Sequence, residues 1–259
     1  MNGGATKARI AATFLFMTAG ALVMLAVAVP TLFMARRFYS EVIGAWLGRA
    51  TLRLWGVRYR VHGEPRPASV QTVYVSNHTS TLDVFVLIGL ALPRTRFFLS
   101  GFLRKVPPIG IVGTLIRIFW TVPQEFPNRR RQIFKRADRV LRATGDSVYL
   151  SPEGERVTTG EIGHFNKGAF HLATSLRAPI VPLYFAIPRE IDPGKGLTPK
   201  AGTIDVYILP PIDTSTWVVA DVEKNRDAVR DLFVRVHDAM RTTGRLPESL
   251  TIAPVEATV

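Results

Sequence analysis

The chain has 259 residues, 47% of them hydrophobic, which is enough for one domain of catalytic size with a full core and one further element. Cysteine is absent and no cluster of His, Asp and Glu has the spacing of a metal site, so the sequence excludes disulfides, a thiol nucleophile and a thiolate-bound metal. The formal net charge of +13 indicates an anionic partner: nucleic acid, an anionic membrane surface or a phosphorylated substrate.

An uncharged segment near the amino terminus, residues 10–35, is the first feature in chain order. At 1.5 Å per residue it is long enough to cross a hydrocarbon core of about 30 Å. It is long for the apolar region of a signal peptide and is closed by Arg36 and Arg37, so we expect a retained anchor, although Ala26-Val27-Ala28 resembles a cleavage signature. Pro30 leaves open a kinked helix that enters one leaflet only. Because basic residues flank both ends, charge does not decide the orientation.

Residues 38–56 predict an amphipathic helix, because apolar side chains recur there at helical spacing. Trp46, together with Arg49 and Arg53, suits a helix that lies at the level of lipid headgroups. An ordinary helix packed on the following domain fits the same pattern equally well. We therefore assign residues 1–56 to an N-terminal membrane anchor and interfacial helix, and leave the contacts of its second part open.

From Val57 onward, short β-branched or aromatic runs alternate with helical stretches, and Gly and Pro mark most of the joins. The predicted strands are Arg58–His62, Thr72–Ser76, Arg96–Ser100, Ile118–Val122, Ser147–Leu150, Ile180–Ala186 and Thr203–Leu209. The predicted helices are Ser80–Ala91, Pro127–Ala143, Lys167–Leu176 and Ala220–Thr242. This alternation predicts an α/β domain over residues 57–246, with a mixed, mostly parallel sheet flanked by helices, and a C-terminal tail at residues 247–259.

The helix predicted at Pro127–Ala143 is strongly basic. Its cations are Arg129, Arg130, Arg131, Lys135, Arg136, Arg139 and Arg142. A solvated basic face is the simpler interpretation, and a face that touches anionic lipid is the functional one. No nucleic-acid-binding motif accompanies the charge, so we expect no nucleic-acid partner.

His78 and Asp83 form the first candidate site, between a predicted strand end and a predicted helix start. Five residues turn a continuous helix by about 500°, so the two side chains cannot share one helical face. They can meet if His78 lies in the turn and Asp83 in the first helical turn, which gives an imidazole with an orienting carboxylate, the pair used in acyl transfer. The alternative is structural, because Ser80-x-x-Asp83 also resembles a helix capping box.

The second candidate site extends from Tyr149 to Arg156. A predicted strand ends there in Pro152-Glu153-Gly154, where proline restricts the entry and glycine lets the backbone approach a ligand. Arg156 supplies a planar guanidinium that suits phosphate. The bare pattern is a charged turn, but ligands of α/β domains collect at such strand ends.

Four motifs occur in order along the chain. They are Asn77-His78-x4-Asp83, Pro152-Glu153-Gly154-x-Arg156, Lys167-Gly168-Ala169-Phe170 and Pro179-Ile180-Val181-Pro182. Their order and spacing resemble the glycerolipid acyltransferase family over roughly residues 57–212. The resemblance implies transfer of a fatty acyl group from acyl-CoA or acyl carrier protein to the hydroxyl of a lysophospholipid of the 1-acyl-sn-glycerol-3-phosphate type. It also implies a bacterial inner membrane, with the catalytic domain on the cytoplasmic face.

The same resemblance implies roles for individual residues. His78 would deprotonate the acceptor hydroxyl, and Asp83 would orient and charge-stabilise its imidazole. The alkoxide would attack the thioester directly, without an acyl-enzyme, a metal or a cofactor. The substrate-binding residues implied are Asn77, Lys105, Glu153, Gly154 and Arg156, with Arg156 at the acceptor phosphate.

The sequence departs from the family pattern in the phosphate-binding positions. Ser100 and Gly101 stand where the family usually has lysines, and Val122 and Pro123 lie near the usual Asp-Arg pair. Part of the phosphate clamp is therefore missing, while the catalytic pair is intact. This favours, as an alternative acceptor, a lyso-lipid with a phosphodiester or aminoacyl headgroup such as lyso-ornithine lipid. The alternative from another class is a non-catalytic membrane lipid-binding protein of the same fold.

Overall fold

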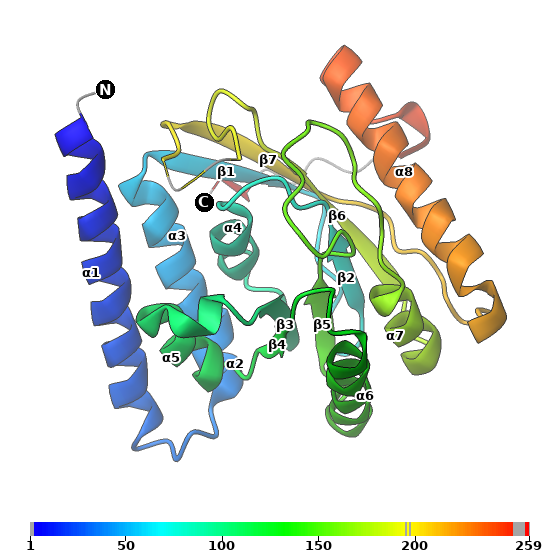
Figure 1. Cartoon of the computed structure of the whole chain (residues 1–259), viewed down its shortest axis with the longest axis horizontal. Helices are drawn as coiled ribbons and strands as arrows, with labels where there is room; N and C mark the ends of the chain where they lie inside the picture. Colours follow the sequence, from blue (N-terminus) through cyan, green and yellow to red (C-terminus); the bar gives the residue numbers. More distant parts are fainter. Residues whose placement is uncertain (1–2, 195, 197, 251–256, 259) are drawn as a thin grey trace.

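A computed structural model describes residues 3–194, 196, 198–250 and 257–258. Among these residues, eight strands form one sheet (Figure 1). Side by side, they are β4 (Phe119–Thr121), β3 (Thr95–Ser100), β5 (Ser147–Leu150), β2 (Val73–Ser76), β6 (Ile180–Ala186), β7 (Gly202–Ile208), β1 (Val57–His62) and β8 (Ala257–Thr258). The seven longer strands match the predicted ranges to within one residue at each end.

The sheet is mostly parallel, as predicted. Strands β4, β3, β5, β2 and β6 run in one direction, and β7 pairs with β6 antiparallel and with β1 parallel. The predicted tail contains a 3₁₀ turn at Glu248–Leu250 and strand β8, which pairs antiparallel with β1; its residues 251–256 and 259 lie outside the described part. Because the central strands are parallel, their carboxyl ends meet at one edge of the sheet, where ligands collect.

Helices cover both faces of the sheet (Figure 1). On one face lie α1 (Gly3–Ala28), α3 (Ala45–Leu54), α4 (Asp83–Gly89) and α5 (Pro107–Leu115), and on the other lie α6 (Pro127–Thr144), α7 (Gly168–Leu176) and α8 (Val222–Thr243). Alternate side chains of a strand face opposite layers: Tyr74 joins the core under α3 and α4, whereas Val73 and Val75 join the core under α7 and α8. The parallel strands thus bury both faces.

Helix α5 was not among the predicted elements. It begins at Pro107, where the missing backbone N–H of proline costs nothing because the first turn of a helix has free donors. The helix is nine residues long and carries two glycines, Gly110 and Gly113, each packed closely against a neighbour: the position of an added Cβ would lie 2.4 Å from the Arg104 carbonyl oxygen and 2.4 Å from the Trp120 ring. Glycine there serves close packing, which a local pattern does not reveal.

The N-terminal segment folds back on itself. Helix α1 is long and apolar enough to cross a membrane and is largely exposed, but it ends at Ala28, short of the predicted end at residue 35. After Pro30 the chain turns through Leu32 and Phe33, both at positive φ, and returns through α2 (Arg36–Phe38) and a π-helical segment (Tyr39–Gly44) into α3. Helices α1 and α3 lie side by side, with Gly20 against the Leu47 side chain (Figure 1).

The predicted membrane-flanking residue Arg36 is buried instead. Its guanidinium Nη2 lies 2.7 Å from Asp146 Oδ1, and Arg96 Nε lies 2.8 Å from the other oxygen of the same carboxylate. All three side chains are less than a tenth exposed. Asp146 immediately precedes β5 and Arg96 lies in β3, so this ion-paired triad joins the N-terminal layer to the amino-terminal edge of the sheet.

We expect the substitution Asp146→Ala to lower the free energy of unfolding by about 3–5 kcal/mol, because it leaves two buried guanidinium groups without their carboxylate. Denaturant unfolding of the detergent-purified protein measures this loss. Asp227→Ala is the matched control, since it removes a carboxylate that is itself 56% exposed from its pair with Arg226 and should cost far less. Equal losses for the two variants would show that the triad does not stabilise the fold.

Candidate active site

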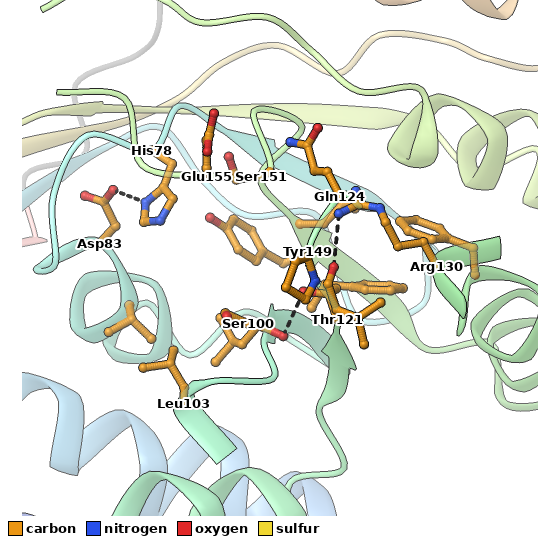
Figure 2. Close-up of a pocket in the computed structure, with 18 of the residues that line it drawn as sticks. His78, Asp83, Ser100, Leu103, Thr121, Gln124, Arg130, Tyr149, Ser151 and Glu155 are labelled. Atoms are coloured by element: carbon orange, nitrogen blue, oxygen red, sulfur yellow. Dashed lines mark hydrogen bonds and ion pairs between the residues drawn. The ribbon is translucent and has the colours of Figure 1, made fainter. Parts of the chain in front are cut away.

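His78 and Asp83 meet at the carboxyl end of β2. His78 lies two residues beyond the strand, and Asp83 is the first residue of α4. Figure 2 shows the imidazole Nδ1 hydrogen-bonded to the carboxylate, with 2.7 Å between Nδ1 and Oδ2. The Asp83 side chain is 3% exposed and the imidazole 33% exposed. Since the carboxylate accepts from Nδ1–H, Nε2 is the nitrogen left to accept a proton from another group.

Asp83 also closes the turn that carries His78. The same oxygen, Oδ2, accepts hydrogen bonds from the backbone N–H groups of Thr79 at 2.9 Å and Ser80 at 3.0 Å. The hydroxyl of Ser80 in turn accepts from the Leu82 N–H and donates to the buried carboxylate of Asp192. The structural and the chemical interpretations of this motif therefore coexist, because one carboxylate satisfies the turn and orients the imidazole.

Glu153 holds the backbone on the other side of His78. Its carboxylate is buried and accepts from the His78 N–H at 2.5 Å and from the Gly163 N–H at 2.8 Å. Burial raises the pKa of Glu153 to about 7, against the opposing effect of the two N–H donors and of His78. Glu153 does not line the cavity described below, so its observed contacts are those of a positioning residue.

The amide of Asn77 is also fully engaged by the backbone. Its Nδ2 donates to the Phe185 carbonyl at 3.0 Å and its Oδ1 accepts from the Phe185 N–H at 2.8 Å. This pair fixes the end of β2 to β6. The contact of Asn77 with substrate stays a prediction. Gly154, in contrast, lines the cavity at φ 76°, and an added Cβ would lie 2.7 Å from the Asn166 amide nitrogen.

The structure does not bring Lys105 and Arg156 into the cavity. Lys105 is exposed in the 3₁₀ turn Leu103–Lys105, of which Leu103 alone lines the cavity. Arg156 is exposed and donates to the Thr81 hydroxyl, in the turn between His78 and Asp83.

A cavity of about 530 Å³ opens beside the imidazole (Figure 2). Its apolar wall comes from α4, β3 and the following turn, through Val84, Leu87, Phe98, Leu99 and Leu103. The polar wall comes from the ends of β3, β4 and β5, through Ser100, Thr121, Gln124, Ser151 and Glu155. This size and this division suit a ligand with one apolar and one polar part.

Arg130 is the one arginine or lysine among the described residues that lines this cavity. It lies in the first turn of α6, at the end of the cavity opposite His78 in Figure 2. The guanidinium is half-buried, and burial lowers the pKa of Arg130. It donates a hydrogen bond to the Val122 carbonyl at 3.3 Å, and it has no carboxylate partner among the described residues. Such a group is a ready partner for a ligand anion.

The sequence included Arg130 in a run of arginines without distinguishing it from its neighbours. The available signal was its spacing of four residues from Phe134, since the two lie on one face of α6 and both line the cavity. Ser100, Val122 and Pro123 also line it, so three of the four positions at which the chain departs from the family pattern face the cavity, and Gly101 does not.

Known acyltransferases are similar to this chain in sequence. Residues 58–186 match the family model described as Acyltransferase. The 1-acyl-sn-glycerol-3-phosphate acyltransferase beta of Homo sapiens is 30% identical over 204 residues, which cover 78% of this chain and 70% of that protein. The enzyme of that name from Limnanthes alba is 28% identical over 203 residues, covering 76% of this chain and 69% of that protein.

A solved structure shares the fold. The crystal structure of the 1-acyl-sn-glycerophosphate (LPA) acyltransferase, PlsC, from Thermotoga maritima superposes with a TM-score of 0.68, at 18% identity, over 90% of this chain and 98% of that one. The matches in sequence extend over the strands and turns that carry His78, Asp83 and Glu153. The chain belongs to the acyltransferase family.

Proposed function

We propose that this protein moves a fatty acyl group from a thioester donor, acyl-CoA or acyl carrier protein, to the free hydroxyl of 1-acyl-sn-glycerol 3-phosphate. The observation that carries the proposal is the His78–Asp83 hydrogen bond at the rim of a cavity with apolar and polar walls. The similarity to relatives named for this activity supports the choice of acceptor.

The reaction follows from the position of the imidazole. His78 Nε2 takes the proton of the acceptor hydroxyl, and the hydroxyl oxygen attacks the thioester carbonyl carbon. The carbon–sulfur bond then breaks, and the thiolate leaves with the proton that the imidazolium returns. Asp83 stabilises the imidazolium through Nδ1, so the products are an ester and a free thiol, and the histidine is regenerated.

Arg130 is our candidate for the acceptor phosphate. The missing lysines and Asp-Arg pair favoured an acceptor other than lysophosphatidate, but a half-buried guanidinium without a carboxylate partner supplies a cation in the same cavity. Lysophosphatidate is therefore our first acceptor, and a lyso-lipid with a phosphodiester or aminoacyl headgroup is the alternative. Arg156, exposed and bonded to Thr81, ranks second as a phosphate ligand.

The N-terminal layer supports action at a membrane. Large apolar side chains are exposed along α1, the turn after it and α3, and they include Leu15, Leu22, Leu32, Met34 and Trp46. We propose that residues 1–56 hold the protein on a bilayer, that residues 57–246 form the catalytic domain, and that residues 247–259 are a tail. By analogy with the bacterial PlsC we assign it to the inner membrane, with the catalytic domain on the cytoplasmic face.

The first test is transfer from labelled acyl-CoA and acyl carrier protein to a panel of lyso-lipids. We expect His78→Ala to lower kcat by roughly 10²–10⁴-fold, because the hydroxyl loses its base. We expect Asp83→Asn to lower kcat by about 10²-fold, because a neutral amide stabilises an imidazolium poorly. His164→Ala, an exposed histidine outside the cavity, is the control. Full activity of His78→Ala with unchanged thermal unfolding would rule out this mechanism.

We expect Arg130→Ala to raise the KM for lysophosphatidate by about tenfold or more, since it removes a partly desolvated cation from the phosphate. Arg130→Lys should restore part of the affinity. Arg156→Ala should change this KM less, because its guanidinium lies outside the cavity. The reverse order of the two effects would assign the phosphate to Arg156, and a panel including lyso-ornithine lipid separates the alternative acceptors.

Stability should fall as pH rises through the titration of Glu153. Its native pKa of about 7 exceeds the ordinary pKa of 4.5 for a glutamate, so between these pH values the native state binds more protons than the unfolded state. Its stabilising contribution is therefore complete below pH 4.5 and is lost as pH rises to about 7. Denaturant unfolding across this range should show a shallower decline for Glu153→Gln. Identical slopes for the two proteins would contradict the raised pKa.

A further inference from the structure

A second concavity lies next to the active-site cavity, between α6 and α7. It has a volume of about 870 Å³ and reaches from Arg130 to Val219, just before α8. Arg130 and Phe134 line both cavities, so they form the wall between them. We call this second concavity, with Arg131, Lys135, Arg139, Lys167 and His171 on its rim, the α6–α7 groove.

The α6–α7 groove carries cations that no carboxylate neutralises. Among the described residues, Arg131, Lys135 and Arg139 have no acidic partner. The carboxylate in the groove, Asp138, is already occupied by Arg142 and by the Ser175 hydroxyl, and Lys167 pairs with Glu223. The groove therefore presents three free positive charges to solvent, which favours an anionic ligand.

These charges are arranged in a line. Arg131, Lys135 and Arg139 are spaced by four residues, so they lie on one side of α6 over about 12 Å of helix. A single phosphate monoester would meet one of them, whereas a ligand with several phosphates would meet all three. The groove also has an apolar floor, since Phe134 and the buried Leu172 line it. Cations around an apolar floor suit an aromatic base with attached phosphates.

The groove points away from the proposed membrane contact. Figure 1 shows α6 and α7 on the face of the sheet opposite α1 and α3. Most of the exposed large apolar side chains belong to residues 10–54, whereas Val218 and Val219 are the exposed large apolar residues at the end of the groove. A bilayer that contacts α1 is therefore a poor match for the anion in the groove. A concave site of this volume also suits a small molecule better than the convex surface of a carrier protein.

We propose that the α6–α7 groove binds the phosphorylated nucleotide of a coenzyme A thioester. The linear pantetheine arm then crosses Phe134 into the active-site cavity and places the thioester carbonyl beside His78. This assignment rests on the proposed function, because it presupposes a thioester donor. It separates the two substrates: the donor nucleotide lies on the α6–α7 side, and the acceptor phosphate lies on Arg130 inside the cavity.

The test compares donors with and without the nucleotide. The double variant Lys135→Glu/Arg139→Glu should raise the KM for palmitoyl-CoA at least about tenfold, because two cations on the phosphates become anions. The KM for palmitoyl-4′-phosphopantetheine, which lacks the nucleotide, should stay unchanged, as should the KM for the acceptor. Adenosine 3′,5′-bisphosphate should compete with palmitoyl-CoA in the wild type and lose this effect in the variant.

The matched control is Arg129→Glu/Arg136→Glu. It makes the same change of net charge on the same helix, at exposed positions that line neither cavity, and should leave the KM for palmitoyl-CoA unchanged. An equal rise in the KM for palmitoyl-CoA in both double variants would show that the effect comes from net charge alone and would overturn the proposal. An equal rise for donors with and without nucleotide would mean a damaged fold.

Other outcomes identify other occupants. A rise in KM confined to palmitoyl-acyl carrier protein would mean that the groove binds a carrier protein and not the nucleotide. Loss of binding to phosphatidylglycerol vesicles, with donor KM values intact, would make the groove a lipid-binding surface. If the wild type transferred no acyl group from any donor, the proposed function would fail. Calorimetric binding of coenzyme A to the wild type and to Lys135→Glu/Arg139→Glu would then still test whether the groove binds the nucleotide, because only the wild type should bind it.

Discussion

The site depends on two buried carboxylates that hold the backbone of one turn. Asp83 accepts the N–H groups of Thr79 and Ser80, and Glu153 accepts the N–H of His78 itself. An unpaired buried N–H costs about 1–3 kcal/mol, so three such groups would open the turn if the carboxylates were lost. The position of the imidazole is therefore set by acids that reach it from both sides, one from α4 and one from the loop after β5.

Local pattern predicted most of the fold. The strand ranges matched because both faces of the parallel strands are buried, which leaves β-branched and aromatic runs bounded by Gly and Pro. Helix α5 escaped because its prolines and glycines resemble a loop, although Pro107 suits a first helical turn and Gly110 and Gly113 permit close packing. The burial of Arg36 was not predicted because its partner, Asp146, lies 110 residues away.

The same distinction applies to the site. The contact between His78 and Asp83 could be predicted because the two residues are only five positions apart, so one strand end and the next helix start bring them together. The family resemblance implies that Asn77 binds substrate, but it gives no sign of the hydrogen-bond partner seen in the fold, the backbone of Phe185, which lies 108 residues away. Arg130 was hidden among other arginines, because only the folded packing of α6 decides which guanidinium faces the cavity. A sequence motif reveals partners that are a few residues apart, whereas partners that are far apart in the chain are seen only in the folded structure.

The two roles of Asp83 affect how active enzymes of this fold can be told from inactive relatives. Its hydrogen bonds to Thr79 and Ser80 do not involve the imidazole, so the carboxylate would remain useful to a descendant that had abandoned acyl transfer. The imidazole of His78 makes one polar side-chain contact in the described chain, and that contact is with Asp83. An aspartate at this position is thus weak evidence for an active enzyme, whereas a histidine that nothing structural demands is the better mark of surviving catalysis.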